Sequence, residues 1–286
     1  MPAPPAPRPT AANAAIWFAA DGFDPAAKGI NGRRVAGESF LRGFFRHAQV
    51  EEFVSLAQDS REHAAFAAMA RAAGAEKPLR AVPLHQPEGL APVRAVFYPS
   101  PLDGRECWRR APYGGAAWAL SGITHTTATR AVMQAVFDIR SAPQMPWDAL
   151  ICTSQAVQAS VRSLMDLAED HLAARFPGAV LPARPLLPVI PLGVHCDDHR
   201  PDPAAGQALR QRLGVGPKDI VVSTIARLTP DEKFDPFPLF LALEAAAPAL
   251  AKKGGRFQLV FCGQFREAAW EPAFAEGARR LMPSVP

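Results

Sequence analysis

Short apolar runs and helix-forming segments alternate along most of this chain, and this alternation restricts the fold more than any other feature. The runs at 52–56, 117–123 and 148–154 are rich in aromatic and aliphatic residues, and each precedes a longer segment with apolar residues at helical spacing. Strands that alternate with helices in this way pair in parallel, because the helix returns the chain to the starting end of the sheet. The sequence therefore predicts an α/β fold with a mainly parallel sheet covered on both faces.

The length of 286 residues exceeds that of one typical domain and predicts two. We expect a disordered leader at 1–13, because this proline-rich start lacks the features of a signal peptide. A first α/β domain is predicted at 14–176 and a proline-rich linker at 177–192. A second α/β domain, which we expect to be incomplete, follows at 193–286.

Composition excludes several functional classes. The net charge is +4 and the basic residues are scattered, so nucleic-acid binding is not indicated. No apolar run is long enough for a transmembrane segment. Four widely spaced cysteines predict reduced, mostly buried thiols in a cytoplasmic protein, and peripheral attachment to the inner face of a membrane is left open (Cys107, Cys152, Cys196 and Cys262).

Two cations follow a strand-like run in the second half of the chain. Arg227 and Lys233 come after the β-forming residues 220–224 and before a helical segment that begins near Phe237. Loops at the carboxyl ends of parallel strands open into a crevice beside helix N-termini, where α/β proteins bind ligands. Two cations at this position suit a diphosphate, although such a pair also occurs on solvated helix faces.

A glycine-containing loop follows the first apolar run. The residues from Ala14 to Ala20 predict a buried strand, the next segment contains Gly29, Asn31 and Gly32, and helical spacing begins at Glu38. A strand, a glycine loop and a helix form the opening unit of a doubly wound fold.

Two further strand ends carry candidate residues. The strand at 117–123 is followed by Thr124 and His125, and the strand at 257–261 by Gly263. A histidine in this place can contact a bound sugar, or it can be a hydrogen-bonded structural residue. The segment 195–199, His-Cys-Asp-Asp-His, contains metal-binding residue types, but its spacing is not a zinc pattern and we expect no metal site.

Taken in order, these segments resemble the GT-B glycosyltransferases, and within them the retaining, sugar-nucleotide-dependent family 4. The resemblance extends over roughly residues 14–265 and rests on weak motifs in a common order. The matching positions are Gly29 and Gly32, His125, the Asp-Ala-Leu-Ile-x-x-Ser-like strand at 148–154, the Pro-x-Gly-Val sequence at 191–194, and Arg227 with Lys233.

The resemblance implies two Rossmann-like domains, an acceptor-side domain followed by a donor domain. It implies transfer of a hexosyl group from a nucleotide diphosphate sugar, with retention, without a metal and without any other cofactor. His125, Arg227 and Lys233 would be catalytic, the two cations with Gly29 and Gly32 would bind the donor diphosphate, and Asn31, Thr124 and Gly263 are further cleft candidates. The acceptor can be a glycan, a lipid or a small molecule.

The chain departs from the family pattern in two places. Phe234 stands where the family usually has a glycine, and Glu267, Glu271 and Glu276 do not reproduce the usual pair of donor-binding glutamates. We therefore expect little or no transferase activity from this chain alone. A partner chain that pairs with the open edge of the second domain is one way to complete that domain.

Two other functions compete with a transferase. The chain can be a non-catalytic sugar-nucleotide-binding module derived from such an enzyme. A Rossmann dehydrogenase is disfavoured, because the first glycine loop lacks the Gly-x-Gly-x-x-Gly sequence.

Overall fold

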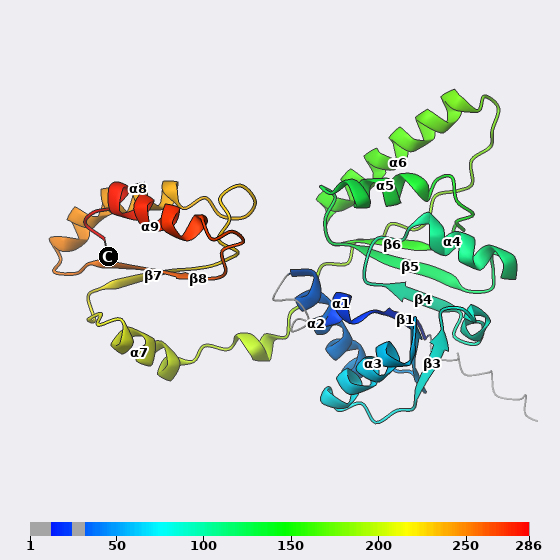
Figure 1. The fold of residues 1–286 in the computed structure, drawn as a ribbon, viewed down its shortest axis with the longest axis horizontal. Coiled ribbons are helices and arrows are strands. Elements are labelled where there is room, and N and C mark those ends of the chain that lie inside the picture. Colours follow the sequence, from blue (N-terminus) through cyan, green and yellow to red (C-terminus); the bar gives the residue numbers. More distant parts are fainter. Residues whose placement is uncertain (1–12, 25–31, 286) are drawn as a thin grey trace, which may run out of the picture. The chain divides into compact units, whose positions relative to one another are not determined.

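A computed structural model describes residues 13–24 and 32–285 of the chain (Figure 1). The chain forms two compact units, and the boundary between them falls after Cys196. We call the residues up to Cys196 unit 1 and those from Asp197 onward unit 2, and describe each by itself. Gly29, Asn31 and all but the last residue of the predicted leader lie outside the described residues.

Unit 1 contains a six-stranded sheet in the order β3-β2-β1-β4-β5-β6, and every neighbouring pair is parallel. The strands are β1 (Ala15–Phe18), β2 (Phe53–Ala57), β3 (Leu79–Pro83), β4 (Ala95–Tyr98), β5 (Ala119–Thr124) and β6 (Ala149–Cys152). The direction of the strand order reverses between β1 and β4, which is where doubly wound sheets bind ligands. The predicted α/β class is confirmed.

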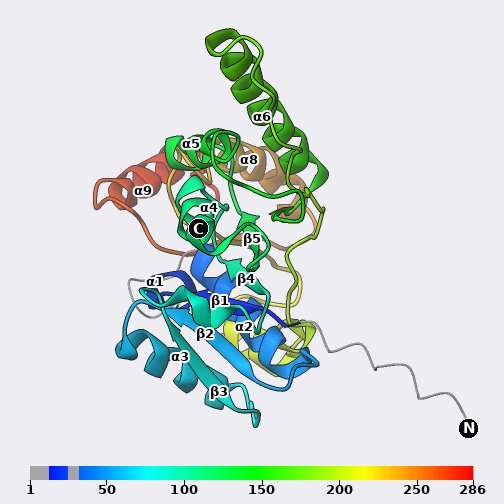
Figure 2. The same ribbon diagram turned by 90° about the vertical axis from the view of Figure 1, so that its right-hand side faces the viewer.

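Helices connect the strands of unit 1. They are α1 (Ala20–Phe23), α2 (Gly32–His47), α3 (Ser60–Ala72), α4 (Gly104–Arg110), α5 (Arg130–Asp138) and α6 (Gln155–Arg175), with short 3-10 turns at Pro87–Leu90 and Ala111–Tyr113. A third 3-10 turn, Cys196–His199, spans the boundary between the units. Ser154 is the N-cap of α6, because its side chain accepts a hydrogen bond from Val157 N at 3.2 Å. The distal part of α6 projects away from the sheet in both ribbon views (Figures 1 and 2).

The start of α2 corrects two expectations. The first strand ends at Phe18 rather than at Ala20, and α2 begins at Gly32 rather than at Glu38, so Gly32 belongs to the helix and not to the preceding loop. Helices α1 and α2 approach each other closely beside Gly37, where a Cβ atom would lie 2.3 Å from the carbonyl oxygen of Gly22. Only glycine allows this approach, which packs the first turns of α2 against α1.

Alternate residues of the strands fill two separate cores. One core includes Ala15, Val54 and Val96, and the other includes Ile16, Phe53 and Phe97. Every residue of β2 is buried, as expected for a strand in a parallel sheet with both faces covered.

The proline-rich segment 177–192, predicted as a linker, lies along the outer edge of β6. Leu186 N donates to Asp148 O at 2.8 Å, and Ile190 N donates to Cys152 O at 2.9 Å. Pro188 has no N–H to continue this ladder, so the segment makes isolated parallel bridges instead of a strand. Prolines are tolerated here because the segment is an edge, and it is therefore extended but belongs to unit 1.

Unit 2 contains two parallel strands and three helices among its described residues, in the order α7 (Pro203–Arg212), β7 (Ile220–Ile225), α8 (Phe237–Ala251), β8 (Phe257–Cys262) and α9 (Trp270–Leu281). Helices α8 and α9 lie on one face of the β7–β8 sheet (Figure 1), and Phe240 lies at the centre of the core that they form with it. On the opposite face, Ile225 is 83% exposed.

The cysteines are free thiols, but they are not mostly buried. Cys107 and Cys152 are buried as expected, whereas Cys196 and Cys262 are exposed. The two exposed thiols lie at the unit boundary and at the end of β8, where packing is incomplete.

Candidate functional site

His125 follows the end of β5, at the edge of the sheet that parallel α/β folds use for ligands. Its ring lines a cavity between α2 and the sheet. Burial, followed by the positive charge of Arg33, lowers the pKa of His125 below its ordinary value of 6.5. The imidazole is therefore neutral near pH 7 and can both donate and accept a hydrogen bond.

Thr124 is the preceding residue and occupies the opposite face of β5, because successive side chains of a strand alternate. It is fully buried, and within the described parts of the chain its hydroxyl has no hydrogen-bond partner. Its carbonyl accepts a hydrogen bond from the Thr153 hydroxyl at 3.1 Å, which ties the end of β5 to the end of β6. Thr124 thus supports the strand end and does not line the cavity with His125.

Two arginines outside the predicted site residues follow Gly32 at the start of α2. The Arg33 and Arg34 guanidiniums form ion pairs with the two carboxylate oxygens of Asp21, at 2.7 Å and 2.6 Å. The hydrogen bond from Arg34 is the main cause that lowers the pKa of Asp21. Two consecutive arginines directly after the glycine-containing segment are the sequence feature from which this positive charge can be predicted.

The cavity beneath α2, which we call the α2 cavity, has a volume of about 520 Å³. Its floor is formed by the strand residues Phe97, Ile123 and Ile151, and α2 contributes Phe40 and Phe44. The segment 190–195 forms another wall.

This wall is attached to α2 through His195. The Nε2 atom of His195 lies 3.0 Å from the carbonyl oxygen of Ser39, and since a carbonyl can only accept, Nε2 carries the proton. His195 is thereby a structural residue. Within the described residues, no group of three or more His, Cys, Asp and Glu side chains could hold a metal ion.

In unit 2, Arg227 follows β7 and is joined to a second arginine through one carboxylate. Arg227 Nη1 donates to Glu232 Oε2 at 2.9 Å, and the other oxygen of Glu232 pairs with Arg266, which follows β8. Lys233 is exposed in the turn that contains Glu232. The structure therefore adds Arg266 to the two cations predicted from the sequence, and it places an acidic residue between the two arginines.

Gly263 has a structural reason to be glycine. A Cβ atom there would lie 1.8 Å from the carbonyl oxygen of Ala226, so the ends of β7 and β8 could not approach each other with any other residue. Phe234, which departs from the family pattern, packs against Phe261 and Phe274 with ring centroids 5.7 Å and 6.4 Å apart. Both residues shape the ends of the strands beside Arg227.

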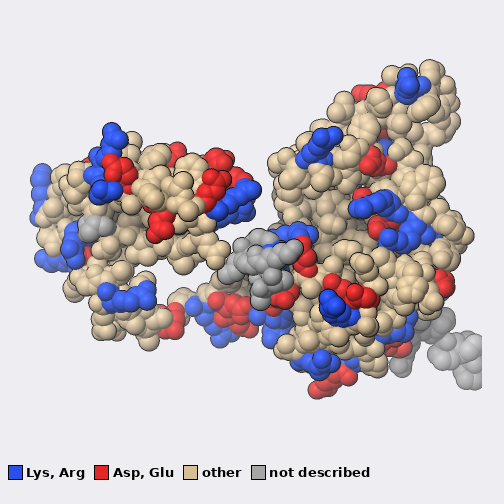
Figure 3. Space-filling model, in the orientation of Figure 1, with Lys and Arg blue, Asp and Glu red and all other residues tan. Residues whose placement is uncertain are grey.

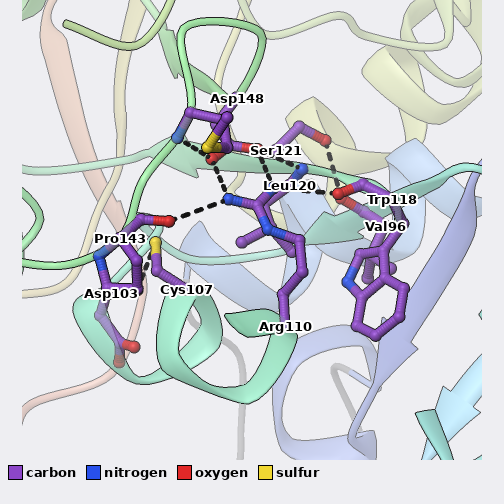
Figure 4. A network of polar contacts seen from close by, with 10 residues as sticks. Val96, Asp103, Cys107, Arg110, Trp118, Leu120, Ser121, Pro143 and Asp148 are labelled. Atoms are coloured by element: carbon purple, nitrogen blue, oxygen red, sulfur yellow. Dashed lines mark hydrogen bonds and ion pairs between the residues drawn. The ribbon is translucent and has the colours of Figure 1, made fainter. Parts of the chain in front are cut away.

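A buried ion pair supports β5 and β6, the strands that carry His125 and Ile151 (Figure 4). The Arg110 guanidinium donates to both carboxylate oxygens of Asp148, at 2.6 Å and 2.7 Å, and neither side chain is exposed. Asp148 also accepts hydrogen bonds from Leu120 N and Met145 N. The carboxylate is thus satisfied by charge-assisted bonds from three segments.

The surface and the helices give two further observations. On the face drawn in Figure 3, basic and acidic residues are interspersed and form no single basic patch. Among the helices in the described residues, none is long and apolar enough to cross a lipid bilayer.

The fold defines the class of this chain: it is a mainly parallel α/β protein with Rossmann-like units. No protein-family model and no curated protein matches it in sequence. Its structure is similar to the crystal structure of Alr3699/HepE from Anabaena in complex with UDP, with a TM-score of 0.52 and 15% identity over 94% of this chain and 66% of that chain. The HepE structure in complex with UDP-glucose matches with a TM-score of 0.46 and 17% identity, over 87% of this chain and 64% of that chain.

This chain therefore spans about two thirds of the length of HepE. At 15% identity the likeness shows a shared fold.

Proposed function

We propose that this chain is a glycosyltransferase of the GT-B type, similar to family 4, which moves a hexosyl group from a nucleotide diphosphate sugar to an acceptor. The observation that carries this proposal is the cluster of cations at the carboxyl ends of β7 and β8, in a fold like that of a protein crystallised with UDP. The chain spans 66% of the length of HepE. The proposed transfer activity therefore includes the case in which this chain acts as part of a longer protein.

In this proposal, Arg227, Lys233 and Arg266 bind the donor diphosphate. The carboxylate of Glu232 already bridges the two arginines, so an anion occupies the position that we assign to a phosphate oxygen. Guanidiniums bind carboxylate and phosphate with similar geometry, and a diphosphate would replace Glu232 as their partner. Fixed cations here would compensate the charge that develops on the leaving group, without a metal ion.

The reaction breaks the bond between the anomeric carbon and a diphosphate oxygen and forms a bond from that carbon to the acceptor oxygen. The hydroxyl proton of the acceptor passes to an oxygen of the departing diphosphate. A neutral His125 suits a hydrogen bond to a sugar hydroxyl, and its low pKa keeps a second positive charge away from the oxocarbenium-like centre. Retention of configuration belongs to this proposal through the resemblance to family 4.

The proposal includes Gly29 and Gly32 as binding residues of the donor diphosphate, with Asn31 as a further candidate for the cleft. Gly32 is at the first position of α2, where the backbone N–H groups have no partner within the helix. Arg33 and Arg34 add positive charge at this helix start. They share the negative charge of Asp21, as Arg227 and Arg266 share that of Glu232.

A non-catalytic sugar-nucleotide-binding module is the second candidate. The exposed face of β7–β8, with Ile225 at its end, favours this function for the chain alone, because a further segment or a partner chain would have to cover it. Such a module would bind the nucleotide through the same cations and transfer no sugar.

The deciding experiment combines a thermal-shift assay with a transfer assay. UDP, GDP and ADP and their hexose conjugates are added to the full chain, and at a hundredfold excess over Kd a true ligand adds about 2.7 kcal/mol of stability. We expect Arg227→Ala to lose this shift, and Arg279→Ala, which removes an exposed arginine paired with Glu276, to retain it. Binding without hexose transfer selects the module, and no shift with any nucleotide contradicts both functions.

A further inference from the structure

The α2 cavity differs in chemistry from the donor site proposed above. None of the described residues that line it is Asp, Glu, Lys or Arg. A nucleotide diphosphate carries negative charges that need cations or many N–H donors, so this cavity is poorly suited to the donor. Its volume of about 520 Å³ is nevertheless typical of a small-molecule pocket.

Several apolar side chains around the α2 cavity are exposed to solvent. Phe40 on α2 is 37% exposed, and the opposite wall contributes Ile190 at 51%, Leu192 at 50% and Val194 at 69%. An apolar surface that gathers around a concavity marks a place where another molecule is bound.

The exposed surface is mainly aliphatic. The Phe40 ring already stacks on Phe97, with ring centroids 4.4 Å apart, and on Phe44 at 5.9 Å. These rings pair with one another, whereas the exposed side chains of the segment 190–194 are the aliphatic Ile190, Leu192 and Val194. The wall therefore suits a flexible hydrocarbon chain better than a flat ring.

Polar residues also line the α2 cavity: Ser39 and His47 on α2, His195, whose Nε2 atom is already paired with Ser39 O, and His125 directly after β5. A molecule with its hydrocarbon part in the cavity could place a hydroxyl within reach of the His125 imidazole. The cavity and His125 thus match the two halves of an amphiphile.

We propose that the α2 cavity is a subsite for the aliphatic chain of the acceptor, and that the acceptor is an amphiphile with a hydroxyl-bearing head. This inference rests on the proposed transferase function and specifies the class of its second substrate. The head lies beside His125 and the chain packs between α2 and the segment 190–195.

The test is calorimetric titration of the full chain with methyl, butyl, hexyl and octyl β-glucosides below their micelle concentrations. Each methylene that leaves water strengthens binding by up to about fourfold, so affinity should rise steadily along the series. Burial of apolar surface also predicts a negative heat-capacity change that grows with chain length. An affinity that does not depend on chain length overturns the inference.

A matched pair of variants separates this site from nonspecific detergent binding. Leu192→Asn places an amide in the cavity wall and should weaken octyl glucoside binding about tenfold. Leu167→Asn changes another exposed leucine, on α6 outside the cavity, and should leave the affinity unchanged. Equal loss in both variants overturns the inference.

The same titration in saturating UDP separates the two proposals. Octyl glucoside binding that persists supports a subsite distinct from the donor site, and displacement by UDP overturns the inference. UDP binding without chain-length dependence leaves the transferase proposal intact and removes the apolar subsite. If glucoside affinity rises with alkyl chain length but no nucleotide binds, the transferase proposal is wrong. The cavity would then bind an aliphatic ligand that is not the acceptor of a transferase.

Discussion

Units 1 and 2 share parallel strands joined by helices, but they bury these strands to different degrees. In unit 1 every residue of β2 is buried, whereas no residue of β7 in unit 2 is. Both strands are mainly apolar: β2 reads Phe-Val-Ser-Leu-Ala and β7 reads Ile-Val-Val-Ser-Thr-Ile. An apolar strand composition therefore does not by itself predict that the strand is buried. The helices packed on each face of the sheet determine whether it is.

The difference between the units predicts where stability lies. Among the residues that the structure describes, unit 1 has two cores on opposite faces of its sheet, and unit 2 has one. Since buried apolar area is the main favourable term in folding, unit 1 should be the more stable unit. Four measurements test this comparison, from the largest expected effect to the smallest.

The largest effect is expected from Arg110→Met in unit 1. The variant leaves the Asp148 carboxylate buried without its cation, which costs about 3–5 kcal/mol of unfolding free energy. Urea denaturation followed by circular dichroism measures this loss. Arg105→Met breaks an exposed ion pair with Asp103 and should cost at most about 1 kcal/mol. Similar losses in both variants would contradict the structural role of the buried pair.

A smaller effect is expected from Phe240→Leu in unit 2. Phe240 is fully buried and lies at the centre of the single core, so we expect a loss of about 1–2 kcal/mol. If the units unfold separately, only the transition at lower urea should shift. A shift of both transitions by the same amount would show that the two units unfold together.

The third measurement concerns pH and His125. Burial, and then Arg33, lower the pKa of His125 in the folded chain below 6.5. Between these two pKa values the unfolded chain binds more protons, so the unfolding free energy of unit 1 falls as pH decreases through that window. His125→Gln should flatten this fall, measured by urea denaturation at pH 7.5 and at stepwise lower pH. Parallel curves for the two proteins would contradict the prediction. Asp21 and Glu169 have lowered pKa values and lose stability at lower pH than His125 does.

The smallest effect on stability is expected from Ile225→Thr. The side chain is 83% exposed, so the unfolding free energy should change by less than about 0.5 kcal/mol. Self-association should decrease, because less apolar surface on unit 2 is accessible. Sedimentation velocity at several concentrations checks this expectation. Val35→Thr, on an exposed face of α2 in unit 1, is the control and should leave the association unchanged.

Local patterns in the sequence predict the elements well because they depend on neighbouring residues. The helical segment predicted to begin near Phe237 is α8, which begins at that residue. The position of His125 after β5 also follows from a local pattern.

Features that depend on distant residues escape such a prediction. The packing of α2 against α1 depends on the close approach of Gly37 to Gly22, and the pairing of Arg110 with Asp148 joins residues 38 positions apart. The α2 cavity combines α2, three strand ends and the segment 190–195. No window of the sequence contains these contacts, because the fold creates them.

The proline-rich edge of unit 1 has a consequence for the growth of ordered aggregates. Fibrils extend by adding strands to an unbroken row of backbone N–H and C=O groups. The segment beside β6 contains Pro185, Pro188 and Pro191, so it is a poor template for another strand. β7 and β8 contain neither proline nor a charged residue, and templated growth should therefore begin at unit 2.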